Sequence, residues 1–129
     1  MAVGLAAATL NALLDVVCRS VAYDVTAFYV KLHTGDPGAA GTSNAAGETT
    51  RKLATFSAAS GGAITTSAAL EWTNVPAAET ISHVSFWDAS SGGTFLGSDD
   101  LATPRLLAIG DTFTISAGDV DLSISPVAA

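Results

Sequence analysis

The sequence has few of the residues that cross-link small proteins. Cys18 is the only cysteine among 129 residues, so no internal disulfide can form and a hydrophobic core must hold the fold together. The neighbouring Val16, Val17 and Val21 are apolar, which predicts a buried and unreactive thiol. A chain of this length fits one domain.

Basic residues are also scarce. Five lysines and arginines stand against twelve acidic residues, which gives a formal net charge of −7. Phosphate backbones would repel such a chain, so nucleic acid is not an expected partner. Charged residues make up 13% of the chain and apolar residues 49%, so small and neutral side chains must cover much of the surface. Such a surface tolerates burial against neighbouring subunits.

The first apolar stretch lacks the features of an export signal or a membrane span. No basic residue precedes it, and Asn11 and Asp15 interrupt it. A membrane span would need about 18 uninterrupted apolar residues. We therefore expect a soluble protein that is made in a cytoplasm and has no membrane partner.

Residues 3–21 show the spacing of an amphipathic helix. Asn11, Asp15 and Arg19 lie four residues apart on one face, where Asp15 and Arg19 are in the favourable order for an ion pair. The apolar stripe on another face consists of Leu10, Leu13, Leu14, Val17 and Val21. These five residues are our candidate interface. Residues 1–22 either pack on their own domain or form an arm that docks on a neighbour.

After Asp24 the pattern alternates, which predicts short strands separated by glycine-rich turns. Strands that recur every 8 to 12 residues favour an antiparallel β-sandwich or jelly roll in residues 23–129. We expect the segment 36–50 to be a long surface loop. The expected strands are 26–34, 51–57, 62–72, 80–88, 93–98, 105–110, 111–118 and 119–125.

Two histidines and two aspartates are the strongest metal-ligand candidates. His33 and His83 would meet on an exposed sheet face if their strands are neighbours, with Asp36 and Asp88 nearby. Their spacing matches no known zinc pattern, so we predict no metal site. A further acidic set lacks an EF-hand pattern and is expected to be solvated; it consists of Asp99, Asp100, Asp119 and Asp121.

Catalytic patterns are missing as well. No serine sits in a nucleophile elbow, and the glycine pairs lie between strands rather than before a helix, so we expect neither an enzyme nor a cofactor. The stretch "LHTGDPG" reads as a strand end followed by a turn, because Asp36 precedes proline and Pro37-Gly38 is a common turn pair.

Three aromatic residues leave a second kind of function open. Tyr29, Trp72 and Trp87 would suit the stacking surface of a carbohydrate-binding module. The alternative is that they pack in the core or in an interface.

Four features of the sequence stand out together: "LHTGDPG" at 32–38, Arg51, "VPA" at 75–77 and "HVSFWDASSGGTFLGS" at 83–98. In combination they resemble a family of short tailed-phage virion proteins found chiefly in phages of actinobacteria. Thr50 stands where the family pattern would have an aromatic residue. Members are often labelled tail-fibre-like or head decoration proteins. The resemblance implies many copies on a virion, exposed loops and no catalytic residues.

The sequence also lacks the internal repeats that an extended fibre shaft requires. We therefore expect a non-enzymatic virion structural protein, first of all a capsid decoration or head-fibre subunit. The alternative within the same class is a minor tail or tail-fibre protein. Its partners would be major capsid or tail proteins and copies of itself, with a trimer as one option.

Overall fold

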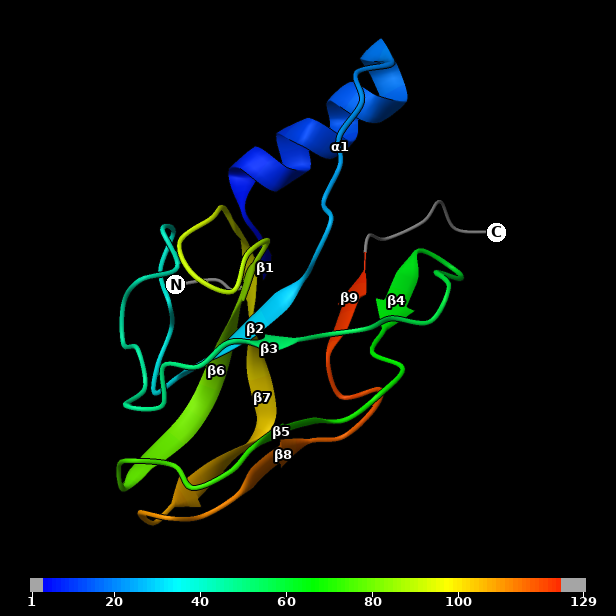
Figure 1. Ribbon diagram of the computed structural model, residues 1–129. Helices are drawn as coiled ribbons and strands as arrows, with labels where there is room; N and C mark the ends of the chain where they lie inside the picture. The colour runs from blue at the N-terminus through cyan, green and yellow to red at the C-terminus, as the bar shows by residue number, and fades with distance from the viewer. Residues whose placement is uncertain (1–3, 124–129) are drawn as a thin grey trace.

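The computed structural model describes residues 4–123, while residues 1–3 and 124–129 lie outside the described part. Figure 1 shows one helix at one end of the molecule and β-strands elsewhere. The helix is α1 (Ala7–Arg19). The strands are β1 (Gly4–Leu5), β2 (Tyr29–His33), β3 (Lys52–Leu53), β4 (Ala63–Thr65), β5 (Leu70–Trp72), β6 (Glu79–Trp87), β7 (Phe95–Leu107), β8 (Phe113–Ile115) and β9 (Asp121–Ser123).

The main sheet has five strands in the order β1-β7-β6-β2-β3, and every pairing in it is antiparallel. The other four strands form two short two-stranded ribbons, β4-β9 and β5-β8. The predicted antiparallel, mainly β domain with an N-terminal helix is therefore confirmed. The described residues do not form the two full facing sheets of a closed sandwich, because strands β4, β5, β8 and β9 have only three residues each.

The hydrophobic core lies where the β5-β8 ribbon packs against one face of the main sheet. Val30 and Leu32 of β2 are fully buried and belong to the same cluster as Trp72 and Phe113 of the ribbon. The rings of Trp72 and Phe113 lie 5.9 Å apart. The predicted alternation along β2 is thus correct for its core face.

Two strand boundaries differ from the sequence-based expectation. Parts of the predicted strands 93–98 and 105–110 belong to the single strand β7, whose pairing with β6 continues through a register shift between Ile81 and His83. The predicted strand 62–72 is divided into β4 and β5, which belong to different ribbons. The end of the predicted strand 119–125 lies outside the described residues.

The helix is shorter than the predicted range 3–21. Gly4 and Leu5 instead pair with Ser98 and Gly97 as strand β1. At the other end, Ser20 adopts a left-handed conformation with φ of 57°, which stops the helix. The predicted ion pair on its surface is present, with 3.2 Å between Arg19 Nη1 and Asp15 Oδ1.

Cys18 corrects one sequence-based prediction, because its thiol is exposed rather than buried. The helix is held to the sheet near its first turns, where the Ala6 N–H and the Thr9 hydroxyl both donate to the Leu96 carbonyl at 2.9 Å. The second half of α1 extends away from this attachment (Figure 1). The apolar neighbours of Cys18 are therefore exposed as well; Val17 is 81% exposed.

The long segment 36–50 covers the second face of the main sheet. Residues 44–46 pair with the edge of β2, where the Thr34 N–H donates to the Asn44 carbonyl at 2.8 Å and the Ala46 N–H donates to the Leu32 carbonyl at 3.2 Å. The part of the segment before them crosses the face, with the Ser43 carbonyl 2.8 Å from His33 Nδ1 and Gly41 against the Phe95 ring. At its start, the Gly38 N–H donates to Asp36 Oδ1 at 2.8 Å, which confirms the predicted turn at "LHTGDPG". His33 beneath this segment is 0% exposed, so the expectation of an exposed sheet face there is wrong.

Candidate functional site

Most of the predicted apolar stripe is exposed to solvent. Leu14 is 62% exposed and Val17 81%, while Leu10 and Val21 are each 43% exposed. All four side chains are part of the predicted interface, and we call them the helix stripe; Leu10, Leu14 and Val17 belong to α1, whereas Val21 follows its C-cap Ser20. An apolar row that its own domain leaves in water is typical of a protein contact surface.

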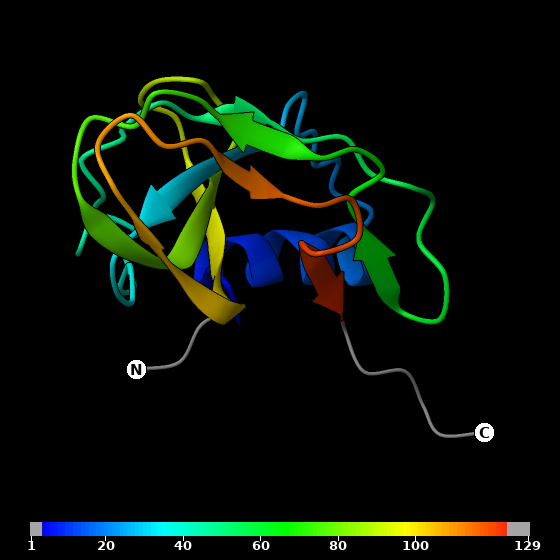
Figure 2. The same cartoon turned by 90° about the horizontal axis from the view of Figure 1, so that it is seen from below.

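The fifth predicted interface residue, Leu13, points into a groove between α1 and the β4-β9 ribbon, which lie next to each other in Figure 2. The groove has a volume of about 340 Å³. Leu5, Ile64 and Leu122 line it together with Leu13, so its walls are almost entirely apolar. The helix thus presents one apolar row outward and one apolar side chain inward.

A buried polar network occupies the face of the main sheet that the segment 36–50 covers. The Trp87 Nε1–H donates to Ser85 Oγ at 2.7 Å, and Ser85 Oγ lies 2.7 Å from His33 Nε2. His33 Nδ1 lies 2.8 Å from the Ser43 carbonyl oxygen, which can only accept. His33 therefore carries its proton on Nδ1, and its Nε2 accepts the Ser85 hydroxyl proton. Every member of this chain has a partner.

Burial lowers the pKa of His33 below its ordinary value of 6.5. The hydrogen bond to the Ser43 carbonyl opposes this shift, whereas the charges of Lys31 and His83 add to it. The neutral imidazole is thus the form that the fold stabilises. In this network His33 has a structural task, holding the segment 36–50 on the sheet.

Arg51 closes the same face from the β3 side. Its guanidinium carbon lies 4.2 Å from the centre of the Trp87 ring, which is a cation–π contact. Its Nη1 donates to the carbonyls of Ala89 and Gly92 at 2.8 and 2.7 Å, and so fixes the turn that follows β6. Burial lowers the pKa of the neighbouring Lys31, and the positive charge of Arg51 lowers it further. Residue spacing did not reveal this role of Arg51; the family pattern singled out the residue but assigned it no role.

The three candidate stacking residues do not form one exposed surface. Trp72 is 1% exposed, and its Nε1–H donates to the Thr50 carbonyl at 2.8 Å. Trp87 is 7% exposed under Arg51, and Tyr29 is partly buried opposite it in the β2-β6 pairing. Tyr29 and Trp87 are therefore brought together, whereas Trp72 packs in the β5-β8 ribbon. Binding of a glycan by this chain stays a prediction.

The metal-ligand candidates are used by other contacts. His33 and His83 face each other in the β2-β6 pairing, but both ring nitrogens of His33 are hydrogen-bonded and His83 Nδ1 lies 2.8 Å from Ser82 Oγ. Asp88 accepts the Thr94 N–H at 2.7 Å. Within residues 4–123 no three His, Cys, Asp or Glu side chains gather in a way that could hold a metal ion.

The fold defines a mainly β protein with an antiparallel sheet and an exposed apolar row on its helix. The particular family follows from a comparison with family models. The model described as Gp80, podophage GP4 fiber I protein gp80, matches residues 4–123, and the chain belongs to this family of phage fibre proteins. No curated protein matches the chain in a sequence search.

Membership establishes a non-enzymatic structural component of a phage virion, as the sequence motifs predicted. The family description supports the fibre alternative better than our first expectation of a capsid decoration subunit. In the described part of the chain, no helix is long and apolar enough to cross a membrane.

Proposed function

We propose that this chain is a minor tail or tail-fibre component that is held in the virion through the helix stripe. The family description supports a fibre role. The observation that carries the proposal is the exposure of Leu14 and Val17, at 62% and 81%. Burying such side chains in a contact contributes roughly 1.5–3 kcal/mol each when burial is complete.

The partners in this proposal are other virion proteins and further copies of the chain. The absence of sequence repeats favours one globular unit of a fibre over a long shaft. The surface of α1 is suited to a close contact because, apart from Asp15 and Arg19, its residues are uncharged. We expect a homo-oligomer, for which a trimer is one option.

The test exchanges one residue of the helix stripe for a charge. We expect Val17→Glu to reduce loading of the chain onto virions by about tenfold or more, because an unpaired carboxylate would have to be buried in the contact. Asn11→Glu is the matched control, since it adds the same charge to the same helix at an exposed position on the polar face with Asp15 and Arg19. Quantitative mass spectrometry of purified particles gives the copy number for each variant.

Two results would contradict the proposal. Normal loading of Val17→Glu would show that the helix stripe is not the contact. Hundreds of copies per particle, with antibody label spread over the head, would favour capsid decoration over a fibre. Light scattering of the purified chain adds the oligomeric state, and a monomer for both the wild type and Val17→Glu would remove self-association from the proposal. Point substitutions are preferable to removing the N-terminal arm, because β1 is part of the main sheet.

A further inference from the structure

A second concave surface lies between β7 and β8, toward the end of the molecule opposite α1 (Figure 1). Its volume is about 360 Å³, within the roughly 300–1,000 Å³ range of small-molecule sites. Leu101, Phe113 and Ile115 provide apolar lining. Phe113 and Ile115 are 3% and 4% exposed, so they form the floor rather than a projecting surface.

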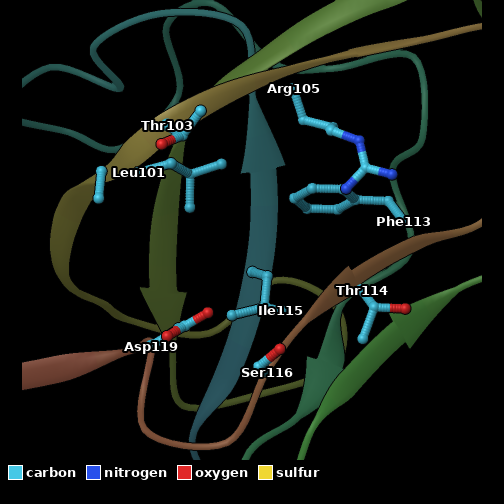
Figure 3. A pocket seen from close by; sticks show the side chains of 9 residues that line it. Leu101, Thr103, Arg105, Phe113, Thr114, Ile115, Ser116 and Asp119 are labelled. Carbon is cyan, nitrogen blue, oxygen red and sulfur yellow. The ribbon is translucent and has the colours of Figure 1, made fainter.

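Five polar side chains surround this floor. Figure 3 shows Arg105 beside the ring of Phe113 at one side of the pocket, with Asp119 and Ser116 across from it. Thr103 and Thr114 complete the set. Within residues 4–123, none of the five side chains makes a hydrogen bond or an ion pair with another residue. Their donors and acceptors are therefore available to a ligand.

We propose that this pocket binds an uncharged saccharide unit. A sugar ring carries hydroxyls that both donate and accept, together with apolar C–H faces. Arg105 can only donate and ionised Asp119 can only accept, while the three hydroxyls of Thr103, Thr114 and Ser116 do either. The apolar floor suits the C–H face. The charges of Arg105 and Asp119 cancel, and the net charge of −7 disfavours an anionic ligand.

An extended peptide added to the edge of β7 fits this surface less well. Pro104 lies in β7 between Thr103 and Arg105, and proline has no N–H to donate to an added strand. The pocket also differs from the surface that Tyr29, Trp72 and Trp87 would have formed, since it includes none of them. The pocket lies far from the helix stripe, so it would stay open when the stripe docks on another virion protein. This point rests on the proposed function.

The test titrates single sugars into the purified isotope-labelled chain and follows the amide resonances by NMR. Glucose, galactose, mannose and N-acetylglucosamine are the probes, with glucuronic acid as the charged comparison. We expect saturable shifts confined to residues 101–105 and 113–119 for at least one neutral sugar, and weaker binding of glucuronic acid. The measurement needs no virion, so its result is independent of where the chain docks.

Two pairs of matched variants identify the residues. Arg105→Gln and Asp119→Asn should each weaken binding by about tenfold or more, because each removes a charge-assisted hydrogen bond. Arg19→Gln and Asp24→Asn make the same chemical changes at exposed sites outside the pocket and should leave binding unchanged. Unchanged thermal midpoints would show that all four variants fold.

Three results would overturn the proposal. The first is the absence of saturable shifts for every neutral sugar up to its solubility limit. The second is undiminished binding in both Arg105→Gln and Asp119→Asn. The third is a set of shifts centred on Tyr29 and Trp87 instead, which would place a sugar on the other face of the main sheet.

Discussion

Two regions of this molecule treat their side chains in opposite ways. On α1, apolar side chains are left in water, and Val17 is 81% exposed. On the face of β2 and β6 under the segment 36–50, polar side chains are buried, and His33 and Ser85 are 0% exposed. Leaving apolar groups uncovered and burying polar ones are both unfavourable unless something compensates.

The difference shows where each compensation comes from. The buried polar groups are compensated within the chain, because Trp87, Ser85, His33 and the Ser43 carbonyl form a complete hydrogen-bonded series. No described residue covers the exposed side chains of the helix stripe, so a partner would have to bury them. The polar face therefore serves stability, whereas assembly is the role we propose for the helix stripe, and substitutions can separate these two roles.

The largest difference is expected between truncations in the two regions. Trp87→Ala should lower the free energy of unfolding by about 3–5 kcal/mol, because it removes a buried ring, its hydrogen bond to Ser85 and the surface that Arg51 covers. Val17→Ala should change it by less than about 0.5 kcal/mol. Urea unfolding followed by circular dichroism measures both. Similar losses for the two variants would mean that α1 is packed on the domain in solution.

A smaller effect should follow from removing one hydroxyl. Ser85→Ala would leave the buried Trp87 Nε1–H and His33 Nε2 without their partner, and we expect a loss of about 1–3 kcal/mol. Ser82→Ala removes a neighbouring hydroxyl of β6 whose hydrogen bond is to the partly buried His83. It should have less than half of that effect. Equal losses in urea unfolding would argue against a special role for the Ser85 network.

Sequence patterns predicted the elements whose environment is periodic. The i, i+3, i+4 spacing placed the helix, and alternation placed Val30 and Leu32 in the core, because both patterns follow directly from backbone geometry. The same patterns could not show whether a second layer covers a given face. The histidine face of β2 was expected to be exposed, yet the segment 36–50 crosses it, with the Ser43 carbonyl on His33 and Gly41 against the Phe95 ring.

Cys18 illustrates the same limit from the other side. Its apolar neighbours predicted burial, but helical periodicity does not say how much of a helix touches its own domain, and the hydrogen bonds that join α1 to the sheet within residues 4–123 lie near its start. The β7-β8 pocket was also beyond the reach of the sequence. Arg105 and Asp119 are fourteen positions apart and have no motif spacing, and only the fold places them around one floor.

The smallest expected effect is on the pH dependence of stability. Because burial holds the pKa of His33 below its ordinary value of 6.5, the unfolded chain takes up the proton at a higher pH than the folded chain does. Stability from this group is therefore complete above about pH 6.5 and is lost as the pH falls toward the folded pKa, by at most about 1.4 kcal/mol per pH unit.

Urea unfolding between about pH 7.5 and 5.5 measures the slope above the range in which carboxylates titrate. His33→Gln should flatten this slope even if it lowers overall stability. A slope that persists in His33→Gln would assign the pH dependence to another group and would show that the buried network does not depend on a neutral imidazole.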